Sequence, residues 1–252
     1  MEQHGTVSSY VRDKVAVITF GHPKGNSLPS KLLKLLADEI EKASGNRNAH
    51  VVVLRSDGAT TFCAGASFDE LLKLKDAKQS KEFFMGFANL INTMRSCQKF
   101  IVTRVQGKAV GGGVGIIAAS DYVLATNTAH VKLSELSIGI GPFVVGPAVE
   151  RKIGKSAFES LAIDSDWHDA FWAKTTGLFT KVYASITELD EEIHKLAEHL
   201  AKYSPDAMAE MKKMFWEGTD NWDKLLEKRA EISGRLILSD FSKNYLKNFS
   251  SK

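Results

Sequence analysis

The 252-residue chain has only two cysteines, Cys63 and Cys97, and their separation fits neither a metal-ligand nor a redox motif. A disulfide-stabilised scaffold and a cysteine zinc site are therefore excluded. We expect both thiols to fill space in an apolar interior and the chain to work in a reducing compartment.

Long apolar runs are also missing. No stretch approaches the roughly 18 apolar residues that a membrane span needs. The first 20 residues lack the basic segment, apolar core and small-residue cleavage site of a signal peptide. We expect a cytoplasmic protein without a membrane partner.

Neither charge sign dominates, because 33 Lys and Arg face 30 Asp and Glu, giving a net charge of +3. This balance gives little support to a nucleic-acid partner and is compatible with a small anionic ligand. The seven histidines are scattered. The nearest promising pair, His194 and His199, would lie about 140° apart around a helix, so we expect no metal site.

What the chain does contain is typical of a globular protein, with 44% hydrophobic and 25% charged residues. Short runs rich in β-branched residues predict paired strands at 7–13 and 14–20 and a buried strand at 50–58. Between them, Pro29 precedes a leucine-rich pattern that predicts a helix over 30–44.

The same order of elements recurs further along the chain. We predict strands at 100–107 and 109–110, a helix at 112–120, and strands at 121–127 and 129–134. Units that each bury a helix against a sheet indicate an α/β core. From about residue 187 the pattern is helical only, so we divide the chain into a core (1–190) and a helical C-terminal region (191–252).

Two turns made of small residues stand where strands should lead into helices. The first contains Ala64, Gly65 and Ala66, followed by Ser67 as a helix cap. The second is the Gly111–Gly113 run before an apolar helix. Such turns expose backbone N–H groups at a helix N-terminus, and two of them facing each other would form an oxyanion hole.

Four motifs occur in a fixed order, namely "GNSL" at 25–28, "CAGAS" at 63–67, "GKAVGGG" at 107–113 and "SELSIGIGP" at 134–142. With these motifs the chain resembles the crotonase, or enoyl-CoA hydratase/isomerase, superfamily. The resemblance implies a crotonase-like (ClpP/crotonase) spiral of β-β-α units with a helical C-terminal region. It also implies homotrimers or homohexamers, with the C-terminal helices aiding trimerisation and closing the pocket.

The resemblance further implies an acyl-CoA thioester as substrate, a place in fatty acid metabolism, and no cofactor, since coenzyme A is part of the substrate. The N–H groups of Ala66 and Gly112 would bind the thioester oxygen. Glu135 would move protons at the acyl carbons as general acid and base. The positions expected to contact CoA or the acyl group are Lys24, Ala64, Gly65, Phe68, Gly111, Gly115 and Phe143.

The sequence departs from the family pattern at one important position. Hydratases carry a second glutamate where this chain has Gly115; Ser67 and Ser134 also replace the usual aspartate and proline.

We expect first a hydratase adding water to a 2-enoyl-CoA, for instance a branched one such as methylglutaconyl-CoA. The alternative is a double-bond isomerase that needs one glutamate. Gly115 would either leave pocket volume for a branched acyl chain or allow a neighbouring element to pack closely.

A third hypothesis comes from a different class of protein. A relative could keep the fold without turnover and bind acyl-CoA or RNA, the latter through lysines in segments 30–42 and 73–81. The balanced charge argues against the RNA-binding version.

Overall fold

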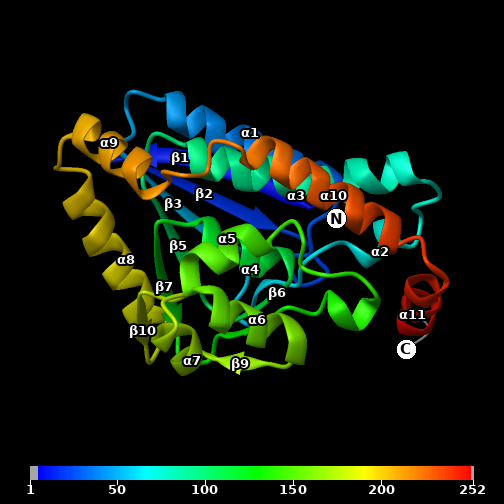
Figure 1. Ribbon diagram of the computed structural model, residues 1–252. Coiled ribbons are helices and arrows are strands. Elements are labelled where there is room, and N and C mark those ends of the chain that lie inside the picture. The colour runs from blue at the N-terminus through cyan, green and yellow to red at the C-terminus, as the bar shows by residue number, and fades with distance from the viewer. Residues whose placement is uncertain (1–4, 251–252) are drawn as a thin grey trace.

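The computed structural model describes residues 5–250, which form two sheets surrounded by helices (Figure 1). The larger sheet pairs its first two strands antiparallel and the others parallel. In spatial order its strands are β1 (Thr6–Arg12), β2 (Val15–Gly21), β3 (Val51–Ser56), β5 (Ile101–Val105), β7 (Tyr122–Thr126) and β10 (Lys181–Tyr183).

The smaller sheet consists of strands that alternate along the chain with those of the larger sheet. Its strands, in spatial order, are β4 (Thr61–Cys63), β6 (Lys108–Val110), β8 (His130–Lys132) and β9 (His168–Asp169). The chain thus visits the large sheet, then the small sheet, then a helix, and repeats this path from β3 to β8. This is the spiral of β-β-α units expected from the sequence.

Helices cover both faces of the larger sheet, because its central strands are apolar on both sides. Val51 and Val53 pack against helix α8 (Ile186–Leu200), whereas Val52 and Leu54 face the main core. The other helices before α8 are α1 (Ser30–Gly45), α2 (Phe68–Leu71), α3 (Ala77–Ser96), α4 (Gly112–Ala119), η1 (Leu136–Ile138, a 3-10 turn), α5 (Gly146–Ile153), α6 (Lys155–Asp164) and α7 (Ala170–Thr175).

The expected helix over 30–44 is present as α1, and the expected strands at 100–107 and 121–127 are present as β5 and β7. The 20-residue helix α3, in contrast, is not among the elements expected from the sequence. Its buried residues nevertheless recur at helical spacing, as in Phe83, Phe87 and Ile91. Cys63 and Cys97 are free and buried, as expected.

The C-terminal region consists of helix α8 followed by α9 (Pro205–Phe215), α10 (Trp222–Leu236) and α11 (Asp240–Ser250). The predicted boundary at 190 falls inside α8, so the helical region starts slightly earlier. Helix α10 packs lengthwise against α3, so the C-terminal region folds back onto an earlier part of the chain (Figure 1). A role of this region in trimerisation remains a prediction.

None of the helices in residues 5–250 combines the length and the apolar character needed to cross a membrane.

Candidate active site

The two small-residue turns lie directly against each other. Gly65 has φ +84°, and a Cβ atom built on it would lie 2.9 Å from the carbonyl oxygen of Val110 and 3.8 Å from the nitrogen of Gly112. Such a φ and such a close approach both favour glycine. Segments 63–67 and 107–113 thus come together, which the order of motifs alone could not establish.

The N–H groups of Ala66 and Gly112 are free to bind an external acceptor. Within residues 5–250, neither group donates one of the hydrogen bonds found in the structure, although the adjacent backbone is well bonded. Gly112 is the first residue of α4, where helical N–H groups have no partner in their own helix. The two donors therefore have the availability that an oxyanion hole requires.

The "GNSL" motif holds the first turn in place. Leu28 donates its backbone N–H to the oxygen of Gly65, and its own oxygen accepts from Ser67. The Asn26 side chain, on a residue with φ +56°, donates to the backbone oxygens of Asp57 and Thr61. This motif therefore positions the turn, a role that the order of the motifs in the sequence does not reveal.

Glu135 lies on the other side of Gly111, at the start of the 3-10 turn η1. The residue is partly exposed, but its Oε2 is buried and has no hydrogen-bond partner among the described residues. Burial disfavours the charged form and raises the pKa of Glu135 from 4.5 to about 7. A Cβ atom on Gly111, which has φ +52°, would lie 3.0 Å from Oε1 of Glu135. The glycine run thus makes room for the carboxylate as well.

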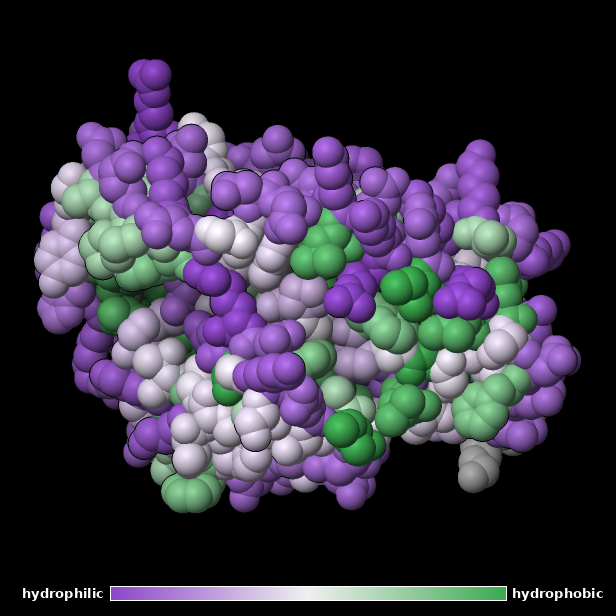
Figure 2. Space-filling model, viewed as in Figure 1, coloured by the Kyte–Doolittle hydropathy of each residue, from purple (hydrophilic) through white to green (hydrophobic). Residues whose placement is uncertain are grey.

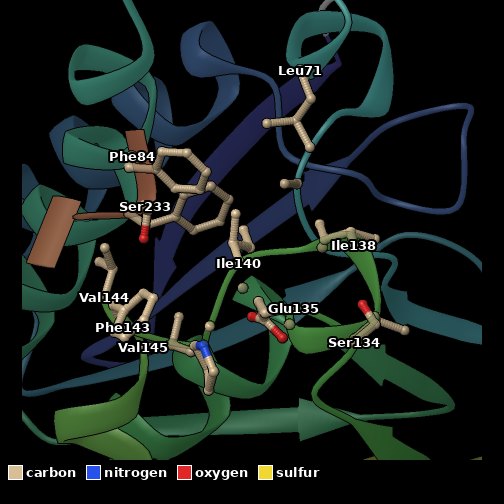
Figure 3. Close-up of a pocket in the computed structure, with 18 of the residues that line it drawn as sticks. Leu71, Phe84, Ser134, Glu135, Ile138, Ile140, Phe143, Val144, Val145 and Ser233 are labelled. Carbon is tan, nitrogen blue, oxygen red and sulfur yellow. The ribbon is translucent and has the colours of Figure 1, made fainter. Parts of the chain in front are cut away.

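These elements enclose a cavity of about 50 Å³ (Figure 3). Its wall is mainly apolar and comes from α3, from η1 and from the segment that leads into α5. Apolar side chains also gather to the right of centre in the view of Figure 2, near the positions of α2 and α11 in Figure 1. The principal apolar side chains of the cavity are Phe84, Phe87, Ile138, Ile140, Val144 and Val145.

Most of the residues proposed from the sequence line this cavity together. They are Ala64, Gly65, Ala66, Phe68, Gly111, Gly112, Glu135 and Phe143. Their roles in binding and catalysis remain predictions, but their convergence in one cavity is what those roles require.

Gly115 does not line the cavity, so the expectation that it leaves pocket volume is wrong. A Cβ atom on Gly115 would lie 2.5 Å from Cγ1 of Val145 and 2.9 Å from its Cβ. The Val145 side chain occupies the space beside the glycine and presents an apolar surface to the cavity. The close-packing alternative is the one that the structure supports.

Lys24 is likewise not part of the cavity wall. Its Nζ is 2.5 Å from Oδ2 of Asp69, which follows the first turn, and both side chains are mostly exposed. The hydrogen bond from Lys24 lowers the pKa of Asp69. Lys24 therefore lies outside this cavity, and its expected contact with a CoA phosphate remains a prediction.

Several residues that line the cavity were not predicted from the sequence. Phe84 and Phe87 come from α3, and the helical spacing of its phenylalanines was the available signal. Ser233 comes from α10, about one hundred residues beyond the motifs, and no sequence signal marks it. No group of three or more His, Cys, Asp or Glu side chains in residues 5–250 is arranged to hold a metal ion.

Comparison with known proteins identifies the class. A family model described as Enoyl-CoA hydratase/isomerase matches residues 11–248. The chain therefore belongs to the enoyl-CoA hydratase/isomerase family, and its architecture is that of a crotonase fold.

Individual relatives are distant. The Bacillus subtilis (strain 168) protein named "Probable enoyl-CoA hydratase" is 25% identical over 248 residues, or 98% of this chain and 96% of that protein. Mitochondrial methylglutaconyl-CoA hydratase of Mus musculus is 26% identical over 188 residues, or 74% of this chain and 60% of that protein. The crystal structure of enoyl-CoA hydratase from Bacillus halodurans has a TM-score of 0.89 at 21% identity, covering 96% of this chain and 99% of that one.

Proposed function

We propose that the protein is an enoyl-CoA double-bond isomerase in which Glu135 is the only acid and base. The observation that carries this proposal is the contact between Gly115 and Val145. Because a valine side chain fills the space beside Gly115, the position of a second carboxylate is closed and apolar. Among the described residues of the cavity wall, Glu135 is the only ionisable side chain.

An isomerase needs no second carboxylate. The substrate is a 3-enoyl-CoA, whose thioester oxygen accepts hydrogen bonds from the N–H groups of Ala66 and Gly112. Ionised Glu135 removes a proton from C2, and the electron pair moves onto the thioester oxygen as a dienolate that the two N–H groups stabilise. The acid form of Glu135 then delivers the proton to C4, and the double bond moves from C3=C4 to C2=C3.

The raised pKa of Glu135 suits this cycle. A group with a pKa of about 7 accepts and returns a proton with similar ease near neutral pH. The free Oε2 also supports the proposal, because no donor from the described part of the chain competes with the substrate for that oxygen.

The hydratase first expected from the sequence is the second candidate. It is favoured by the names of the relatives, including the Bacillus subtilis protein matched over nearly its whole length. In this reaction Glu135 would have to activate water and also supply the proton for C2. Among the described side chains that line the cavity, only those of Ser134 and Ser233 could hold that water besides Glu135.

The two reactions are separated by incubating the protein with 3-enoyl-CoA and 2-enoyl-CoA in parallel and measuring product masses. Isomerisation converts the first into the second at unchanged mass. Hydration adds the mass of one water to the second. Faster hydration than isomerisation would overturn the isomerase proposal and support the hydratase.

We further propose that the enzyme acts on acyl-CoA as a homotrimer or homohexamer and needs no added cofactor. Light scattering coupled to gel filtration measures the assembly, and turnover after exhaustive dialysis against a chelator tests the cofactor statement.

A further inference from the structure

Ser233 presents an unpaired hydroxyl group to the acyl cavity. The residue is only 1% exposed and lies on the inner face of α10. None of the hydrogen bonds found within residues 5–250 involves its hydroxyl, although buried serines in helices usually bond to the preceding turn. Figure 3 shows the Ser233 oxygen between the side chains of Phe84 and Val144, across the cavity from Glu135.

The position of Ser233 is fixed by the contact of α10 with α3. A Cβ atom on the neighbouring Gly234 would lie 2.9 Å from the backbone nitrogen of Lys81, so the two helices approach closely. Lys81 Nζ is also 2.7 Å from a carboxylate oxygen of both Glu227 and Glu231 on α10. The hydroxyl is therefore held in place before any ligand arrives.

The cavity around this hydroxyl contains no cationic side chain. Glu135 is the only ionisable group among the described residues that line it. An acyl chain ending in a carboxylate would thus bury a charge without a partner and meet Glu135 in its ionised form. A plain hydrocarbon chain, in contrast, would offer the Ser233 hydroxyl no partner and leave it unsatisfied.

We propose that Ser233 is a specificity-determining residue that binds a neutral oxygen group, a hydroxyl or a carbonyl, toward the far end of a short acyl chain. The inference rests on the proposed function, because it uses the same cavity and the same acyl-CoA substrate. It adds the class of acyl group, and it argues against a dicarboxylic acyl group such as methylglutaconyl.

The test uses three 3-enoyl-CoA substrates of equal chain length that end in a methyl, a hydroxymethyl or a carboxylate group. The wild-type protein should prefer the hydroxymethyl substrate over the methyl one by about three- to tenfold in kcat/KM, the effect of one neutral hydrogen bond. The carboxylate substrate should be the poorest. In Ser233→Ala the preference for the hydroxymethyl substrate should disappear, because kcat/KM for that substrate should fall to the value measured for the methyl substrate with the same variant.

A matched control is Ser160→Ala, on the exposed side of α6, where the serine hydroxyl bonds only within its own helix. This variant should keep the wild-type preference. A preference that survives Ser233→Ala, or a wild-type preference for the methyl or carboxylate substrate, would overturn the proposal.

Binding measurements keep this test separate from the choice of reaction. The affinities of the three corresponding saturated acyl-CoA thioesters, which cannot react, are measured by calorimetry. Loss of the hydroxymethyl preference in Ser233→Ala supports the role of Ser233 even if the protein proves to be a hydratase. Equal affinities for all three ligands would refute that role even if isomerase activity is confirmed.

Discussion

The side chain of Val145 stands where a side chain on Gly115 would have to lie, since a Cβ atom there would be 2.5 Å from Val145 Cγ1. These two residues, 30 positions apart in the sequence, are therefore coupled. A glutamate at 115 requires a smaller residue at 145, and the valine at 145 requires a glycine at 115.

This coupling predicts the result of restoring the second carboxylate. Gly115→Glu alone should lower the free energy of unfolding by about 1–3 kcal/mol, the usual cost of overpacking a core, and should impair turnover. Adding Val145→Gly should recover much of that stability and allow hydration of 2-enoyl-CoA. Thermal unfolding and product masses measure both effects, and Val145→Gly alone is the control. A Gly115→Glu protein as stable as the wild type would show that the two positions are not coupled.

Removal of the carboxylate at 135 should stop the reaction. Glu135→Gln keeps the shape of the side chain but cannot transfer the proton, so we expect kcat to fall by about 10²- to 10⁴-fold. Glu150→Gln, an exposed position on α5, should leave kcat unchanged. Full activity in Glu135→Gln would mean that another group acts as the base.

The pKa of Glu135 predicts how activity depends on pH. Because the base must be ionised before it accepts the C2 proton, kcat/KM should rise with pH and level off above about 7. A profile measured between pH 5 and 9 that is flat around neutrality would be inconsistent with a buried Glu135 as the base.

The same pKa predicts the pH dependence of stability. Between pH 4.5 and about 7 the folded protein keeps a proton that Glu135 has released in the unfolded chain. Stability should therefore fall as pH rises through this window, by up to about 3 kcal/mol for this group. Glu135→Gln does not titrate and should lack this contribution. We expect the melting temperature of the variant minus that of the wild type to increase from pH 5 to pH 8.

Gly111→Ala should lower both the stability of the protein and its activity. The new Cβ would be strained at φ +52° and would lie 3.0 Å from Oε1 of Glu135. We expect a loss of about 1–3 kcal/mol in stability from the backbone strain and a lower kcat from the displaced carboxylate. Gly45→Ala is the control, because a Cβ there meets nothing within 4 Å. Equal effects of the two substitutions would argue against a special role for Gly111.

Local features of the sequence were sufficient to predict many of the strands and helices and the two turns of small residues. The β-branched runs and the leucines of α1 mark elements whose pattern of apolar residues is visible within a few turns or strands. The glycines and alanines of 64–66 and 111–113 indicate backbone that must come close to another group, because each of them lacks a bulky side chain. The motifs of residues 25–142 identified the family for the same reason, since backbone geometry constrains which residues can stand at those positions.

Tertiary structure alone decided the character of the cavity. Phe84 lies on α3, Val145 directly precedes α5, and Ser233 lies on α10. Their meeting in one cavity depends on how these distant segments pack. The raised pKa of Glu135 likewise arises from burial, which no neighbouring residue in the sequence encodes. The sequence by itself determined the fold and the position of the glutamate that we propose as the acid and base, whereas the packing of distant side chains decided that Gly115 faces a valine.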